Sequence, residues 1–70
     1  MEKITIRDEH IKLGQALKLS GAVGSGVEAK VYINEGLVKV NGEVCTERGK
    51  KLFNGDVIKY KDKEYVICGN

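Results

Sequence analysis

The 70-residue sequence contains no proline and no tryptophan, and it has one histidine and two cysteines. It also contains no long apolar run. The longest is Tyr65-Val66-Ile67-Cys68, whereas a helix that crosses a bilayer needs about 20 apolar residues. The first ten residues are mostly polar and do not have the apolar stretch of a secretory signal. These absences predict a cytoplasmic protein that has no membrane partner.

The residue types that carry most enzyme chemistry are scarce. His10 lies among charged residues, and no local motif supplies the nucleophile or the orienting partner that a general base requires. Cys45 and Cys68 lie far apart and form no Cys-x-x-Cys pair, which argues against a zinc site within this chain. We therefore expect no enzymatic activity, no metal and no cofactor. The two thiols should be reduced. A disulfide between them is the alternative if the two cysteines lie on neighbouring strands.

The short length restricts the chain to one domain, residues 1–70. A domain of this size buries only about 60% of the surface that its unfolded chain exposes, so we expect no deep pocket for a small-molecule substrate. The glycine-rich segment at residues 21–26 precedes a predicted helix, as a phosphate-binding loop does. It lacks the Gly-Lys-Ser/Thr ending of such loops, and no buried strand comes before it, so it does not predict a nucleotide site.

Hydrophobic periodicity predicts two helices in the first half of the chain. The first opens at Asp8 or His10 and ends at Gly21, although Gly14 within it costs about 1 kcal/mol relative to alanine. The second covers residues 25–35, because Ser25 and a glutamate three residues later form a capping-box pattern and a glycine follows the last turn.

The remaining segments follow the alternating pattern of strands and turns. The predicted strands are residues 3–7, a hairpin at 38–44 that turns at Asn41-Gly42, and residues 57–61 and 64–68; residues 46–51 form a loop. Two helices followed by several strands around one core predict a small α+β domain.

Positive charge is concentrated in the middle of the chain. The net charge is only +2, but residues 11–55 contain seven basic and four acidic residues and are therefore +3. Arg48, Lys50 and Lys51 cluster in the predicted loop. Lys39 projects from the hairpin, and Lys30 lies near the positive end of the second helix, where a cation does not favour the helix. This pattern indicates a polyanion partner, and an ordinary lysine-rich solvated surface is the alternative.

The order of motifs resembles a known family. The residues that carry the resemblance are Ile11-x-Leu13-Gly14-Gln15-x-Leu17-Lys18-Leu19, Ser25-Gly26-x-Glu28-Ala29-Lys30, Ile33-x-Glu35-Gly36-x-Val38-x-Val40-Asn41-Gly42-Glu43, Arg48-Gly49-x-Lys51-Leu52 and Gly55-Asp56-x-Ile58. Together they resemble the RNA-binding domain named after ribosomal protein S-four, also called the αL module, and most of all its short stand-alone bacterial members of the YaaA/YbcJ type. The resemblance covers a core of about residues 11–67.

The resemblance implies two antiparallel helices packed on a small, bent, mostly antiparallel sheet. It also implies a basic face that docks on structured RNA, either ribosomal or transfer RNA, and an association with ribosomal particles or their assembly. The site residues that it implies are Lys18, Ser25, Lys30, Lys39, Asn41, Arg48, Lys50 and Lys51. Relatives usually carry a second arginine where this chain has Glu47. This acidic residue should weaken the binding of a phosphate by the loop.

Two expectations complete the sequence-based interpretation. The basic side chains should form one face, because the loop at 48–51 and the two outlying lysines, Lys30 and Lys39, would then act on the same RNA. The aromatic side chains follow apolar patterns and should lie in the core instead of stacking on bases: Tyr32, Phe53, Tyr60 and Tyr65. A protein–protein adaptor with the same fold and a DNA-binding module are the alternative functions.

Overall fold

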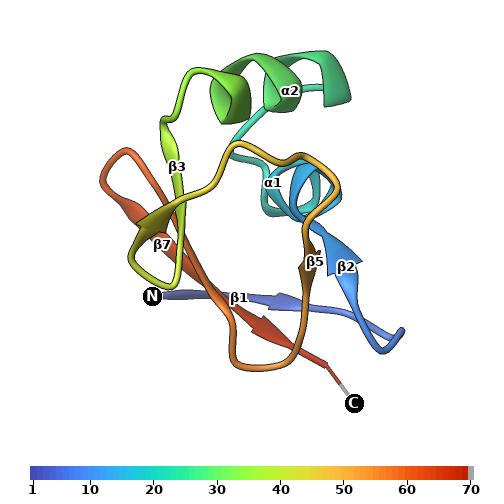
Figure 1. Cartoon of the computed structure of the whole chain (residues 1–70). Helices are drawn as coiled ribbons and strands as arrows, with labels where there is room; N and C mark the ends of the chain where they lie inside the picture. Colours follow the sequence, from blue (N-terminus) through green and yellow to red (C-terminus); the bar gives the residue numbers. More distant parts are fainter. Residues whose placement is uncertain (70) are drawn as a thin grey trace.

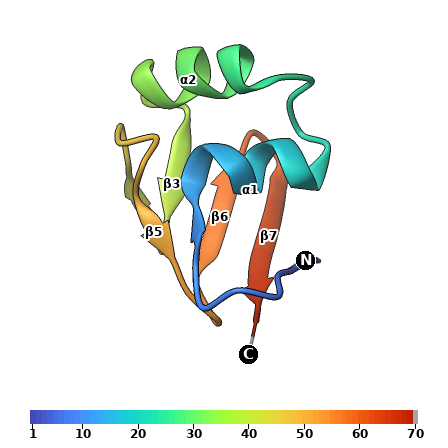
Figure 2. The same ribbon diagram turned by 90° about the vertical axis from the view of Figure 1, so that its right-hand side faces the viewer.

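The computed structural model describes residues 1–69 as two helices that pack against a five-stranded sheet, with a separate two-stranded ribbon at one side (Figures 1 and 2). The elements are β1 (Glu2–Thr5), β2 (Ile11–Lys12), α1 (Leu13–Ser20), α2 (Gly26–Asn34), β3 (Val38–Val40), β4 (Glu43–Val44), β5 (Lys51–Leu52), β6 (Val57–Tyr60) and β7 (Lys63–Cys68). The helices run in opposite directions (Figure 2). The α+β prediction is confirmed.

The five-stranded sheet has the order β1-β7-β6-β3-β4, and the ribbon pairs β2 with β5. Among the described pairings, β1 and β7 are parallel and the others are antiparallel. The mostly antiparallel sheet expected from the resemblance is therefore present.

Alternation along the strands separates a core face from an outer face. The core is entirely apolar within the described residues, and the strand side chains on its side pack with those of α1 and α2. The fully buried side chains include Leu13 and Leu17 of α1 and Ile33 of α2, together with Ile58 and Ile67 of the sheet. The core also takes in Ile4 and Ile6, because β1 pairs with β7, so it begins before residue 11.

The first helix begins later than the sequence pattern predicted. It starts at Leu13 and not at Asp8 or His10, because Ile11 and Lys12 are extended and pair with β5. Pairing with a distant strand overrides the local helical periodicity at these two residues. The predicted end at Gly21 is confirmed, since this glycine adopts the left-handed φ of 82° that closes the last turn.

The second helix and the hairpin follow the predictions closely. Ser25 is the N-cap of α2, and its Oγ accepts a hydrogen bond from the Glu28 backbone N–H at 3.2 Å. Strands β3 and β4 meet at Asn41-Gly42, where both residues have positive φ, as a tight hairpin turn requires. Strand β7 begins at Lys63, one residue before the predicted strand at 64–68, and the turn before it lies at residues 61–62.

The tertiary structure decides whether the two cysteines can form a disulfide and which aromatic side chains are buried. Cys45 and Cys68 are free thiols. Cys45 follows β4 and Cys68 ends β7, with β3 and β6 between these strands, so the two lie about 14 Å apart at the usual strand spacing and too far for a disulfide. Tyr60 and Tyr65 are buried as expected. Phe53 is 44% exposed, and its prediction as a core residue was wrong.

We expect Ser25→Ala to lower the free energy of unfolding by about 1 kcal/mol, because the N–H of Glu28 loses its side-chain acceptor. Ser25→Asp should retain most of the stability, since a carboxylate also caps a helix N-terminus. Urea titrations of the three proteins measure the difference. Equal midpoints for the wild type and Ser25→Ala would show that the cap contributes nothing.

Candidate functional site

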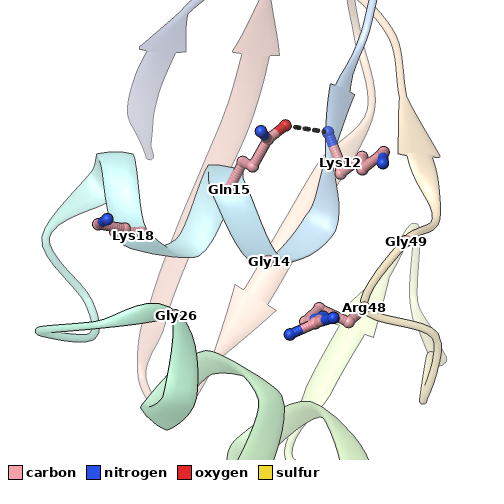
Figure 3. A pocket seen from close by; sticks show the side chains of 7 residues that line it. All are labelled: Lys12, Gly14, Gln15, Lys18, Gly26, Arg48 and Gly49. Carbon is pink, nitrogen blue, oxygen red and sulfur yellow. Dashed lines mark hydrogen bonds between the residues drawn. The ribbon is translucent and has the colours of Figure 1, made fainter.

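An open cleft of about 350 Å³ lies between α1, the first turn of α2 and the loop that precedes β5 (Figure 3). Three cationic side chains line it, and its lining includes no acidic residue. We call this feature the basic cleft. Its lining residues are Lys12, Lys18, Arg48, Gln15, Gly14, Gly26 and Gly49.

Arg48 is held in the basic cleft by contacts with the start of α1. The backbone N–H of Leu13 donates to the carbonyl oxygen of Lys50 at 2.9 Å, and that of Gly14 donates to the carbonyl oxygen of Arg48 at 3.1 Å. A Cβ atom on Gly14 would lie 2.6 Å from Cγ of Arg48, which is too close for two non-bonded carbon atoms. The aliphatic part of the arginine therefore occupies the space that a side chain at residue 14 would need.

This contact explains the glycine in α1. From the sequence alone, Gly14 is only a residue that weakens a helix. The structure shows that its bare backbone lets the loop approach the helix, with Arg48 directed into the cleft (Figure 3).

Lys12 and Lys51 face each other across the ribbon. They are directly opposite partners in the antiparallel pairing of β2 with β5, where side chains of equal charge repel and destabilise the pair. Both side chains are exposed. These two lysines lie at the edge of a cleft that already contains Arg48. A polyanion bound there would reduce the repulsion between their positive charges.

The two helices supply the other predicted lysines near the basic cleft. Lys18 lines it from the last turn of α1, where a cation also stabilises the helix dipole. Lys30 is exposed on α2, one turn after Gly26. Gly26 lines the cleft, whereas Lys30 is not among the residues that line it.

The expectation of a single basic face does not hold for Lys39. Its neighbours Val38 and Val40 are buried in the core, so Lys39 points to the outer face of the sheet. There it lies opposite Lys59 and lines a shallow hollow with Lys59 and Lys61. The alternation of a strand separates this lysine from the basic cleft.

Lys50 also differs from its neighbours in the loop. It lines a separate hollow beside β4, together with Glu43 and Glu47, while Arg48 and Lys51 belong to the cleft side. The loop thus distributes its three cations over two sides.

Two other predicted site residues are engaged within the protein. Ser25 caps α2 through Glu28, as described above. Asn41 uses both ends of its side chain: Nδ2 donates to Oδ1 of Asp56 at 3.1 Å, and Oδ1 accepts from the Val57 backbone N–H at 2.9 Å. These bonds connect the β3–β4 turn to the start of β6, so the role of Asn41 in the structure is to hold this turn in place.

Sequence analysis missed Lys12 as a member of the site. Its charge was visible, but its position depends on the register of two short strands that are far apart in the sequence. The cluster of cations at residues 48–51 gave no signal for it. Gln15 was also missed; its Oε1 accepts a hydrogen bond from the Lys12 backbone N–H at 3.3 Å and so supports the turn into α1.

The arrangement provides fixed positive charge and a concave shape. Within residues 1–69, no three His, Cys, Asp or Glu side chains gather where they could hold a metal ion, and no helix there is long and apolar enough to cross a membrane. The buried side chains of the same residues are all apolar. The lysine and arginine side chains that line the cleft can form charge-assisted hydrogen bonds with an anion.

Residues 4–68 match the family model of the S4 domain. Two curated proteins are similar along most of their length. A protein of Bacillus subtilis (strain 168), named as a probable ribosome maturation protein, RlbA, is 46% identical over 56 residues, which cover 80% of this chain and 79% of that protein. The YbcJ protein of Escherichia coli (strain K12) is 41% identical over 51 residues, which cover 73% of each chain.

Two solved structures share the fold. The solution structure of E. coli YbcJ, described as having an αL motif involved in RNA binding, has a TM-score of 0.74 and 32% identity, with 97% of this chain and 87% of that chain covered. The crystal structure of the 30S ribosomal protein S4e of Thermoplasma acidophilum has a TM-score of 0.65 and 28% identity, with 86% of this chain and 32% of that longer chain covered.

The contact between Gly14 and Arg48 predicts a strong coupling between substitutions at these residues. Gly14→Ala alone should be neutral or destabilising, because the new methyl group must displace the arginine side chain. In an Arg48→Ala background the same change should stabilise the protein by about 0.5–1 kcal/mol, since only the helix-propensity gain remains. Chemical unfolding of the four proteins in a double-mutant cycle measures the coupling. Additive effects would contradict the packing of Arg48 on α1.

Proposed function

The chain belongs to the S4 domain family, and on that premise we propose that it is a non-catalytic RNA-binding protein that docks its basic cleft on structured RNA. The observation that carries the proposal is that Lys12 of β2, Lys18 of α1 and Arg48 of the loop line one cleft that has no acid in its lining, with Lys51 directly opposite Lys12. The names of its relatives, one for ribosome maturation and one for RNA binding through an αL motif, support the same function.

A double-stranded RNA surface fits this cleft better than a small molecule does. RNA helices are recognised mostly by shape and by contacts with phosphates and 2′-hydroxyl groups, which require no deep pocket. Arg48 can offer two parallel N–H groups to one phosphate, while the lysines act as point charges along the backbone. The N-terminal end of α2 adds the positive end of its dipole at Gly26.

We assign the direct phosphate contacts to Lys12, Lys18, Lys30, Arg48 and Lys51. Ser25 and Asn41 contribute by holding α2 and the hairpin turn in place. Lys39 and Lys50 lie outside this contact surface.

The proposed target is ribosomal RNA, in the ribosome or in a precursor of it, and the site of action is then the cytoplasm. Similarity to a protein named for ribosome maturation and to a protein of the small ribosomal subunit favours this RNA over transfer RNA. A protein-binding role has one observation in its favour: Val27 and Val31 form an exposed apolar strip on α2. Salt distinguishes the two roles, because phosphate contacts weaken steeply as salt is added and apolar contacts do not.

We expect Arg48→Ala combined with Lys51→Ala to weaken binding to a structured fragment of ribosomal RNA by about tenfold or more at low salt. The slope of log affinity against log salt should become less steep by about 1.5, because two phosphate contacts are lost. Fluorescence anisotropy over a series of salt concentrations measures both quantities. The fold should persist, since exposed charges contribute little to stability.

A matched control has the same change in charge. Arg7→Ala combined with Lys50→Ala also removes one arginine and one lysine, but both residues lie outside the basic cleft. This variant should keep nearly the wild-type affinity and slope. Equal losses in the two double variants would mean that net charge alone drives binding, and unchanged binding in the first variant would exclude the basic cleft as the RNA site.

A further inference from the structure

One face of the β2–β5 ribbon extends beyond the basic cleft. In this ribbon, Ile11 is paired with Leu52 and Lys12 with Lys51. Leu52 is fully buried and Ile11 packs against the core, so this first pair faces inward. Because successive side chains of a strand point to opposite faces, the pair of lysines faces outward.

The next pair in the same register is aromatic. One step beyond Ile11 and Leu52, the antiparallel register places His10 opposite Phe53, on the face that carries the two lysines. The two rings are in fact in contact: their centroids are 5.9 Å apart and their planes are tilted by 51°. We call the side chains of His10, Lys12, Lys51 and Phe53 the ribbon face.

Phe53 is the aromatic side chain that this surface leaves partly exposed. Its side chain is 44% exposed, whereas Tyr60 and Tyr65 are almost completely buried. Burying a phenylalanine side chain stabilises a small domain considerably, so a ring left partly in water beside two lysines forgoes that gain. A partly exposed aromatic ring beside two lysines has the composition of a nucleotide-stacking site.

We propose that the ribbon face binds one unpaired nucleotide that adjoins the RNA helix docked in the basic cleft. The base stacks on the exposed part of the Phe53 ring, which also contacts His10, and Lys12 and Lys51 hold the adjoining phosphate. The two pairs are two residues apart along the strands, about 7 Å, which one nucleotide spans between its base and its phosphate. Lys12 also lines the basic cleft, so the two surfaces are continuous.

The ribbon face accommodates one nucleotide and not a long single strand. A single-stranded segment requires successive aromatic platforms, and the other ring in this pair, His10, already packs against Phe53. The ligand class is therefore an RNA helix with one unpaired base at its end or in a bulge. A purine should be preferred because its larger ring covers more of the phenylalanine. This inference rests on the proposed function and narrows its RNA target.

The test compares two RNA hairpins that differ by one nucleotide. The first is blunt-ended, and the second carries a single unpaired 2-aminopurine at the end of the same helix. The wild type should bind the second hairpin more tightly and quench the fluorescence of the 2-aminopurine on stacking. Phe53→Leu should lose about tenfold in affinity for the second hairpin, lose the quenching, and bind the blunt hairpin as the wild type does. Phe53→Trp should restore both the affinity and the quenching.

The outcomes separate this inference from the function on which it rests. Equal affinity of the wild type for the two hairpins without quenching would overturn the nucleotide site and leave the basic cleft as the RNA site. An equal loss for both hairpins in folded Phe53→Leu would also overturn it, because the ring would then only support the cleft. If the wild type binds neither hairpin in a salt-dependent way, the proposed RNA-binding function itself fails.

Discussion

The attachment of the Arg48 loop to the first turn of α1 is the contact on which the candidate site depends. The carbonyl groups of Arg48 and Lys50 accept hydrogen bonds from Gly14 and Leu13, backbone N–H groups that have no partner within the helix itself. The same two bonds bring β5 beside β2 and place the arginine over Gly14. One backbone contact therefore fixes the start of the helix, the register of the ribbon and the position of a cation in the cleft.

The protein keeps its sources of stability apart from its charged surface. Its core contains apolar side chains only, as far as the described residues go, and it extends from β1 through both helices to β7. The cations lie outside this core, where screening by water limits their effect on folding in either direction. Such a domain can place Lys12 opposite Lys51 without losing its fold, and the repulsion favours whatever anion binds there.

Like-charged pairs alone do not identify the site, because Lys39 and Lys59 form a second one on the outer face of the sheet. Shape and the packing of Arg48 distinguish the basic cleft from that pair. The cleft is concave, it draws charge from three elements, and its arginine is held by the helix on which it rests. The packing of Cγ and Cδ on Gly14 restricts the Arg48 side chain, so it loses less conformational entropy on meeting a phosphate than an unrestricted lysine does. This makes Arg48 the centre of the proposed contact surface.

The sequence by itself determined the features that short-range signals control. The cap at Ser25 and the tight turn at Asn41-Gly42 each depend on residues within a few positions of one another, and both appear in the structure as predicted. The ordered motifs of the resemblance were likewise enough to identify the S4 domain family and its fold.

Only the tertiary structure decided which side chains share a surface. It moved the start of α1 to Leu13, placed Lys12 beside Lys51, turned Lys39 to the outer face and left Phe53 exposed beside His10. Each of these outcomes depends on the pairing and register of segments far apart in the chain. A shift of one residue in that register would send every side chain of the ribbon to the opposite face, and no local pattern records which register is adopted.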